Sequence, residues 1–274
     1  MNRLRKATPL FLAAVLGLAG CSSVASKFIG FGQSGFARLI DASNATTGSL
    51  ALEADGAVIN SGVSSATPIG VYSKVGATSI KFDVNTGAGT SDVVPAINLT
   101  IAPSTNYTIV LEGEPSGSNY MAFGFQDTNA LNNAATVRFK VNNAAPNLST
   151  PVDVYVWLPP APIPTTPTVG GLALNQDSGS TPSHPGDSYI PTQGSSTFLP
   201  SGTYNIAIVP AGGTPNGSTD LFDGHAPMTV NISYSLTIED LDVTPNHISV
   251  LSSIDEPFQG ANQTAIAHRA VRVH

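Results

Sequence analysis

The sequence predicts an all-β protein made of two tandem β modules, each closed as a sandwich or a barrel. From Gly35 onward, short apolar or alternating runs are separated by Gly, Pro, Asn, Asp and Ser, as in half-buried strands joined by turns. No segment shows the amphipathic spacing of a helix, and the second half of the chain repeats the first. Many short strands with frequent turns pack most economically as a sandwich or a barrel.

The first module is expected over residues 35–130. Asp55-Gly56 lies between two of its strands and is predicted to form a two-residue type I′ hairpin turn, because that turn needs positive φ at both central positions. The predicted strands lie at residues 36–41, 49–53, 57–60, 68–74, 78–84, 96–101, 106–112 and 120–125.

The second module, residues 131–274, is recognised from two matches to the first. Ala37-Arg38-Leu39 matches Val137-Arg138-Phe139 at an offset of 100 residues, and the run that begins at Tyr107 matches the run that begins at Tyr234 at an offset of 127. The second module has therefore gained about 27 residues between these two points.

The natural place for this insertion is the Pro-, Gly- and Ser-rich stretch at 159–200. Because proline cannot donate to a sheet ladder, this stretch is predicted to be a long surface loop rather than an array of strands. A binding loop and a poorly ordered insertion both fit the composition. Farther on, Ala270 to His274 resembles the opening strand once more, and we expect it to close the second module, the alternative being the remnant of a third.

The amino-terminal segment has the features of an export leader that ends in a lipidation signal. Three basic residues among the first six precede an uncharged apolar run at 9–18, and Leu18-Ala19-Gly20-Cys21 follows with the chain's single cysteine. The run is shorter than the roughly 20 residues that a spanning helix needs. The segment resembles the lipobox of bacterial lipoproteins.

That resemblance implies cleavage between Gly20 and Cys21, acylation of Cys21, a signal peptide of residues 1–20 and a tether of residues 21–34. Two or three acyl chains hold a protein stably at a membrane, since each buried methylene contributes about 0.8 kcal/mol. Ser22 rather than aspartate follows the cysteine, which by the same resemblance implies the outer membrane. An ordinary secretory leader and an uncleaved anchor are the alternatives.

The charge of the mature chain argues against nucleic acid as a partner. Without the leader, 8 Lys and Arg remain against 18 Asp and Glu, a net charge of −10. Charged residues make up only 11% of the chain, against roughly 25% in a typical soluble domain. Hydroxyls and amides must therefore solvate much of the surface.

Three stretches of the second module resemble domain of unknown function 4397. They run from Val137 to Pro146, from Val152 to Val156 and from Pro200 to Ile208. The resemblance covers residues 135–250, and residues 36–125 more weakly, where the first copy lacks the family's usual His and Pro after the opening strand. It implies immunoglobulin-like or transthyretin-like β-sandwiches in tandem, in a bacterial envelope or secreted protein with no established activity.

Beyond Cys21, one aromatic pair is a candidate binding platform. In the strand that contains them, alternation places Tyr155 and Trp157 on one face and Val154 and Val156 on the other. An exposed Tyr155 and Trp157 pair beside the insertion would suit a sugar or a proline-rich peptide, whereas a core position for the pair is the alternative.

No set of residues predicts a catalytic or metal site. The histidines lack paired spacing, Cys21 is used by lipid, and Gly32-Gln33-Ser34-Gly35 departs from the nucleophile elbow. Two acidic clusters lack the spacing of a calcium loop and are expected to be solvated. These residues are His184, His225, His247, His268 and His274, with Asn216, Asp220 and Asp223 in the first acidic cluster and Glu239, Asp240 and Asp242 in the second.

We therefore expect a lipid-anchored protein of the bacterial cell envelope that acts as a structural or interaction module, without enzymatic activity, cofactor or metal. Its expected partners are the membrane, through Cys21, and an envelope protein or glycan. The first alternative is a ligand-binding lipoprotein that uses residues 159–200, and the second is a hydrolase assembled from distant residues.

Overall fold

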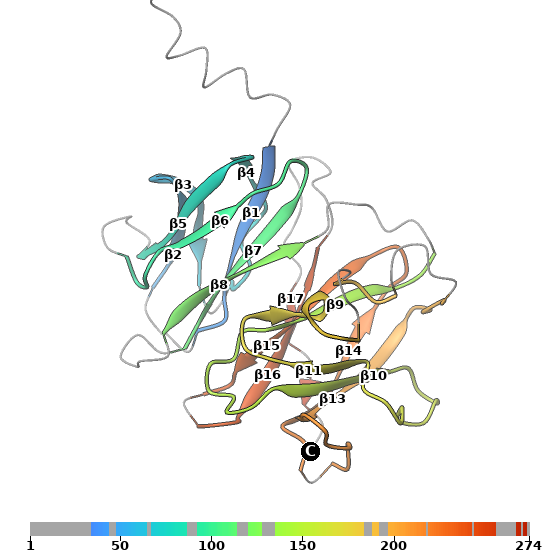
Figure 1. The fold of residues 1–274 in the computed structure, drawn as a ribbon. Coiled ribbons are helices and arrows are strands. Elements are labelled where there is room, and N and C mark those ends of the chain that lie inside the picture. The colour runs from blue at the N-terminus through green and yellow to red at the C-terminus, as the bar shows by residue number, and fades with distance from the viewer. Residues whose placement is uncertain are drawn as a thin grey trace, which may run out of the picture.

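Each half of the chain folds into a two-sheet β-sandwich, which confirms the predicted fold class (Figure 1). The computed structural model describes residues 34–43, 48–64, 67–86, 92–113, 120–127, 135–183, 188–191, 197–217, 219–242, 244–255, 267–269 and 271–272. Within these ranges the chain forms strands and one short 3-10 turn, and no α-helix. The predicted signal peptide, Cys21 and residues 22–33 of the predicted tether lie outside the described residues, and Ser34, which was expected in the tether, begins the first strand.

Module one contains two four-stranded sheets. Its interface sheet, which faces module two, has the order β4-β1-β7-β8, and its distal sheet has the order β3-β2-β5-β6. The interface strands are β4 (Ser73–Gly76), β1 (Ser34–Asp41), β7 (Asn106–Glu112) and β8 (Met121–Asp127). The distal strands are β3 (Ala57–Val63), β2 (Leu50–Ala54), β5 (Ser79–Thr86) and β6 (Ile97–Thr100).

Module two repeats this topology and adds one strand to each sheet. Its interface sheet has the order β12-β9-β15-β16-β17, and its distal sheet has the order β11-β10-β13-β14-β18. The interface strands are β12 (Gln176–Asp177), β9 (Arg138–Asn143), β15 (Ser233–Asp240), β16 (Ile248–Ile254) and β17 (Ala267–Arg269). The distal strands are β11 (Val169–Leu172), β10 (Val152–Trp157), β13 (Gly202–Pro210), β14 (Phe222–Met228) and β18 (Val271–Arg272).

Strand pairing corrects one of the two sequence matches. Arg38 lies beside Thr108 in the parallel pair β1–β7, and Lys140 lies beside Ser235 in the parallel pair β9–β15. Because Thr108 and Ser235 are equivalent at the offset of 127, Arg38 is equivalent to Lys140 at an offset of 102. The predicted offset of 100 is wrong by two residues, and the gain between the two points is 25 residues. A two-residue shift keeps every side chain on its face, so the hydrophobic pattern does not detect it.

A local hydrogen bond supports the corrected offset. The Ser43 N–H donates to the Asp41 carboxylate at 3.2 Å, and the Ala145 N–H donates to the Asn143 side chain at 3.2 Å. Both pairs end the first strand of their module, and they are 102 residues apart. The two modules therefore leave their first strand by the same turn.

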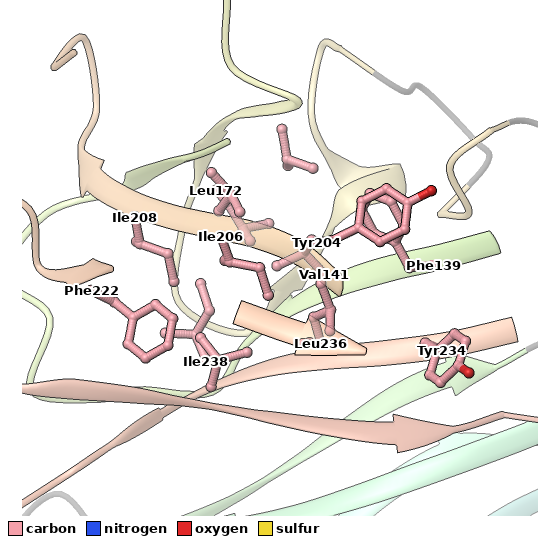
Figure 2. Close-up of a cluster of buried hydrophobic side chains, with 14 of the residues drawn as sticks. Phe139, Val141, Leu172, Tyr204, Ile206, Ile208, Phe222, Tyr234, Leu236 and Ile238 are labelled. Carbon is pink, nitrogen blue, oxygen red and sulfur yellow. The ribbon is translucent and has the colours of Figure 1, made fainter. Parts of the chain in front are cut away.

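Each sandwich has its own apolar core between its two sheets. In module one, Leu39 and Ile109 of the interface sheet meet Leu52 and Phe82 of the distal sheet. In module two, Phe139 and Leu236 of the interface sheet lie in one cluster with Tyr204 and Phe222 of the distal sheet (Figure 2). Alternation leaves the opposite face of each interface sheet free to pack against the other module.

The predicted hairpin turn at Asp55-Gly56 is confirmed. Asp55 has φ of 49° and Gly56 has φ of 79°, the signs that a type I′ turn needs at its two central positions. The turn joins β2 to β3, where Ala54 pairs with Ala57.

In each module a tyrosine near the start of the equivalent strand, β7 or β15, hydrogen-bonds to the backbone of the preceding loop. The Tyr234 hydroxyl accepts the N–H of Thr229 at 2.9 Å, and the Tyr107 hydroxyl accepts the N–H of Ala102 at 3.3 Å. Both acceptors lie five residues after their donors, an arrangement like the tyrosine corner of immunoglobulin-like sandwiches.

Removing the Tyr234 hydroxyl is expected to destabilise the protein. Tyr234→Phe leaves the ring in place but takes away the acceptor of the Thr229 N–H, which we expect to lower the free energy of unfolding by about 1–2 kcal/mol. Urea unfolding of the variant beside the wild-type protein measures the difference. An unchanged midpoint would show that the tyrosine corner does not stabilise this sandwich.

The prediction of a long surface loop at 159–200 holds for residues 159–168 and is wrong for the described residues between 169 and 190. This stretch contains β11, β12 and a 3-10 turn at Ser178–Ser180, and Ile190 forms a β-bridge to Phe139. Val169, Leu172, Tyr189 and Ile190 are buried, so apolar residues outside the proline cluster bring the segment into the sheets.

The C-terminal residues close module two, as predicted. β17 pairs antiparallel with β16 in the interface sheet, and β18 pairs antiparallel with β14 in the distal sheet. One short segment of chain therefore lies along an edge of both sheets.

Candidate functional site

The two interface sheets pack against each other around an apolar centre. Ile40 and Val110 of module one and the rings of Phe123 and Phe125 lie in one buried cluster with Ala144 and Leu251 of module two. This cluster is separate from the two sandwich cores. The modules are therefore joined by a continuous buried contact, and at its two ends the contact becomes polar.

At one end, two buried ion pairs cross from module to module. The Arg38 guanidinium of β1 contacts the Asp255 carboxylate, which directly follows β16, at 2.5 Å. The Lys140 ammonium of β9 contacts the Asp127 carboxylate of β8, also at 2.5 Å. Each module thus supplies one cation that pairs with a carboxylate of the other module. Because Arg38 and Lys140 are equivalent positions of the repeat, the two ion pairs are related by an approximate symmetry.

The carboxylates are completed by hydroxyl donors from their own modules. The second oxygen of Asp127 accepts from the Tyr72 hydroxyl at 2.7 Å and from the Thr108 hydroxyl at 2.5 Å. The second oxygen of Asp255 accepts from the Tyr189 hydroxyl at 2.9 Å and from the Ser235 hydroxyl. In both carboxylates one oxygen receives a cation from across the interface and the other receives two hydroxyls.

The cations make matching contacts beyond their carboxylates. Arg38 donates to the Ile254 carbonyl at 2.8 Å, and Lys140 donates to the Gln126 carbonyl at 2.6 Å. The Arg38 guanidinium also lies 4.3 Å from the centroid of the Tyr72 ring, within the range of a cation–π interaction. We call these residues the interface network: Arg38, Tyr72, Thr108, Asp127, Lys140, Tyr189, Ser235 and Asp255.

The electrostatics of the interface network act differently on its two carboxylates: burial, followed by the charge of Asp127, raises the pKa of Asp255, whereas Asp127 keeps its charged form. Burial by itself would raise the pKa of Asp127, but Lys140 and Arg38 outweigh burial and hold this pKa below its ordinary value. The side chains of Asp127 and Lys140 are fully buried. A charge-balanced set of this kind holds two surfaces in one relative orientation, because any displacement leaves a buried charge without its partner.

The other end of the interface holds two glutamates. Glu112 ends β7 and Glu239 lies near the end of β15, at equivalent positions of the repeat, and both are at most 1% exposed. Burial, followed by the charges of Glu239 and Asp240, raises the pKa of Glu112 well above its usual range. Glu112 accepts one hydrogen bond from the Gly113 N–H at 3.1 Å, and Glu239 accepts one from the Ser249 hydroxyl at 2.8 Å.

The predicted aromatic platform divides between a buried ring and a half-buried one. The valines at 154 and 156 face the core of module two and Tyr155 and Trp157 face the other way, as alternation requires. Tyr155 is only 3% exposed and donates to the Gly213 carbonyl at 3.0 Å. Trp157 packs against the same small cluster and is the more accessible ring of the pair.

The second acidic cluster of the sequence is separated by the fold. Glu239 faces module one, Asp240 is buried on the opposite face of β15 and accepts the Asn147 N–H, and Asp242 is exposed beyond the strand. Burial raises the pKa of Asp240 to about 6. Three neighbours in sequence therefore lie in three different environments.

The other candidates are held by local contacts or lie outside the described residues. Asp220 accepts the N–H groups of Asn216 and Gly217 at 3.1 Å, and Asp223 lies in β14. The Asp242 carboxylate contacts His247 Nδ1 at 2.6 Å, and His225 is half-buried in β14. His184 and His274 are outside the described residues, as is the side chain of His268. No group of three or more His, Cys, Asp or Glu suited to a metal ion occurs in the described part of the chain.

The interface network was not predicted from the sequence, although two sequence patterns indicate it. Arg38 sits between apolar neighbours in β1, and Lys140 does so in β9, which is the pattern of a cation that enters a buried environment. Glu112 and Glu239 end two runs that match in sequence. A carboxylate retained at the end of a repeated apolar strand is a second such signal.

No model of a known protein family matches the chain, and no curated protein matches it. In the ranges that the structure describes, no helix has the length and apolar character needed to cross a membrane.

Proposed function

We propose that this protein is a lipid-anchored protein of the bacterial cell envelope whose two joined sandwiches act as a non-catalytic structural or interaction unit. The observation that carries the proposal is the leader that ends in Leu18-Ala19-Gly20-Cys21. Acyl chains on Cys21 would attach the mature chain to the membrane, and the outer membrane is the proposed location. The resemblance to domain of unknown function 4397 supports an envelope location.

The structure supports the second half of the proposal. The interface network and the apolar cluster beside it join the modules through buried contacts, as expected of a unit that presents surfaces in a fixed arrangement. Between Cys21 and the start of β1 at Ser34, the intervening residues reach at most about 45 Å when fully extended. The anchored body would therefore stay close to the membrane surface.

Residues 159–200 do not form a separate ligand-binding loop in this proposal. Their buried residues belong to the core of module two, and Tyr189 belongs to the interface network. The segment therefore contributes to the fold that joins the modules.

Cys21→Ser tests the anchor. We expect the variant to lose acylation and to move from the membrane fraction to the soluble fraction, because the thiol that carries lipid is gone. Fractionation of cells followed by immunoblotting gives the distribution, and incorporation of a labelled fatty acid reports acylation directly. Ser22→Ala is the matched control and should stay anchored. A Cys21→Ser chain that remains fully in the membrane fraction would refute the lipid anchor.

A further inference from the structure

The C-terminal segment shows how an extended chain binds the edges of a module. In β17, His268 pairs with Ser252 of β16, and in β18, Val271 pairs with His225 of β14. The segment thus adds one strand to the interface sheet and one to the distal sheet of module two. Strand addition of this kind gives affinity through main-chain hydrogen bonds.

Among the residues that the structure describes, module one has the same two edges without added strands. Strand pairing makes Gly124 of β8 the equivalent of Ser252. At the offset of 102, Leu50 of β2 corresponds to Val152 of β10, and the pairing outward from these two strands makes Asn98 of β6 the equivalent of His225. In the described part of the chain, β8 and β6 are the last strands of their sheets on this side. Module one therefore has, at these edges, the positions that β17 and β18 cover in module two.

The direction of the backbone groups follows from one hydrogen bond. The Asp255 N–H donates to the Ser233 carbonyl of β15 at 2.8 Å, so the backbone N–H and C=O groups of residues 255, 253 and 251 point toward β15. The groups of the residues between them, among them Ser252, point the other way, toward β17. The equivalent residues of β8 are Ala122, Gly124 and Gln126, whose backbone groups point away from β7. Ala122 and Gly124 are half-buried and Gln126 is exposed.

At the end of each of the two edges, β16 and β8, a backbone carbonyl accepts a hydrogen bond from a buried cation of the other module. Arg38 binds the Ile254 carbonyl of module two, and Lys140 binds the Gln126 carbonyl of module one. An added strand on β8 would therefore end at the same point as β17 does on β16. The β16 edge is covered by β17, and the β8 edge has no added strand among the described residues. Both edges end at a carbonyl that is bound by a cation of the other module.

We propose that the β8 and β6 edges of module one bind an extended, basic segment of another polypeptide by strand addition. The occupant is expected to resemble the segment that fills the equivalent edges: residues 267–272 contain two arginines and no acidic residue. Residues 35–130 carry eight Asp and Glu against three Lys and Arg. Without Glu112, whose pKa is raised, and without Asp127 and Arg38, which are paired with module two, six carboxylates remain against two lysines, a net negative charge that favours a basic partner.

A second copy of this chain is a poorer occupant. Its own C-terminal strands already pair within module two, where a short connection gives an effective concentration on the order of mM. A separate polypeptide has no such competing site in its own chain. This inference rests on the proposed function as an interaction unit and names the class of partner, whereas the lipid anchor is tested independently of it.

A peptide with the sequence of residues 264–274 is the probe, used with the full mature chain carrying Cys21→Ser. We expect it to bind and to slow amide hydrogen exchange at Ala122, Gly124 and Asn98, because these edge groups become paired. A peptide in which both arginines are replaced by glutamate should bind about tenfold more weakly or less. Exchange measured by NMR locates the bound strand without any change to the protein.

Ala122→Pro and Ala122→Ser form the matched pair of variants. Proline removes an outward N–H and leaves the ladder to β7 intact, so we expect about tenfold weaker binding, whereas the Ala122→Ser variant should bind within about twofold of wild type. Protection only at β16 and β14, or no protection, would overturn the proposal. Dimerisation of the chain through residues 264–274, with protection at β8, would make a second copy the occupant and overturn the assignment to another polypeptide.

Discussion

Replacing Asp255 with alanine is expected to lower the free energy of unfolding by about 3–5 kcal/mol. The substitution leaves the buried guanidinium of Arg38 without its carboxylate and removes the acceptor of the Tyr189 and Ser235 hydroxyls. Loss of one partner of a buried pair costs more than loss of both, because an uncompensated charge stays in the interface. Urea unfolding followed by the fluorescence of Trp157, which lies in module two, measures the change.

Asp242→Ala is the control for this experiment. Asp242 is also paired with a basic side chain, His247, and accepts the Thr244 N–H, but both side chains are partly exposed, so its loss should change stability by no more than about 1 kcal/mol. The double variant Arg38→Met with Asp255→Leu should recover much of the loss, since neither charge then remains. Equal unfolding midpoints for Asp255→Ala and Asp242→Ala would contradict a stabilising role for the interface network.

Replacing Glu112 with glutamine is expected to stabilise the protein, and increasingly so as the pH rises. Burial and the neighbouring charges of Glu239 and Asp240 raise the pKa of Glu112 in the folded protein above its unfolded value. Below the unfolded pKa both states are protonated, and the raised pKa contributes its full stability. As the pH rises toward the folded pKa, the unfolded state loses its proton first and that contribution is lost.

The glutamine variant carries no titrating proton at this position, so it avoids the loss. We expect little difference from wild type at pH 4 and a gain of about 1–3 kcal/mol at pH 8, measured by urea unfolding across this range. Glu53→Gln, in the distal sheet of module one and away from the interface, is the matched control. A difference between Glu112→Gln and wild type that does not change with pH would contradict a buried, protonated Glu112.

Much of the architecture could be predicted from local pattern. Short alternating runs predicted most strands of module one, and β7 has the predicted bounds of 106–112. The strand predicted at 68–74 is wrong, because β4 spans Ser73–Gly76. Asp55-Gly56 predicted its turn because the geometry of that turn depends on two residues alone. Tyr107 and Tyr234 were matched correctly because each fixes the start of the same strand in its module.

The local sequence pattern did not predict the structure of segments whose conformation is set by residues far away in the chain. The proline cluster suggested a loop at 159–200, yet Val169 and Leu172 are buried in the core of module two and form part of β11. The offset of the first strand was wrong by two residues because only its pairing with β7 or β15 determines register. Alternation correctly placed Tyr155 and Trp157 together on the face opposite the two valines, but whether that face is covered depends on the loop near Gly213, which accepts a hydrogen bond from Tyr155.

The sequence alone determined that this chain is all-β and built from two repeats, since alternation and turn chemistry are properties of neighbouring residues. It also supplied the leader and Cys21, on which the proposed anchor rests. Only the tertiary structure decided what Arg38, Lys140, Asp127 and Asp255 do, because ion pairs between modules join residues more than 200 positions apart in one case and 13 in the other. No local pattern encodes which buried cation meets which carboxylate; that depends on how two finished sheets pack face to face.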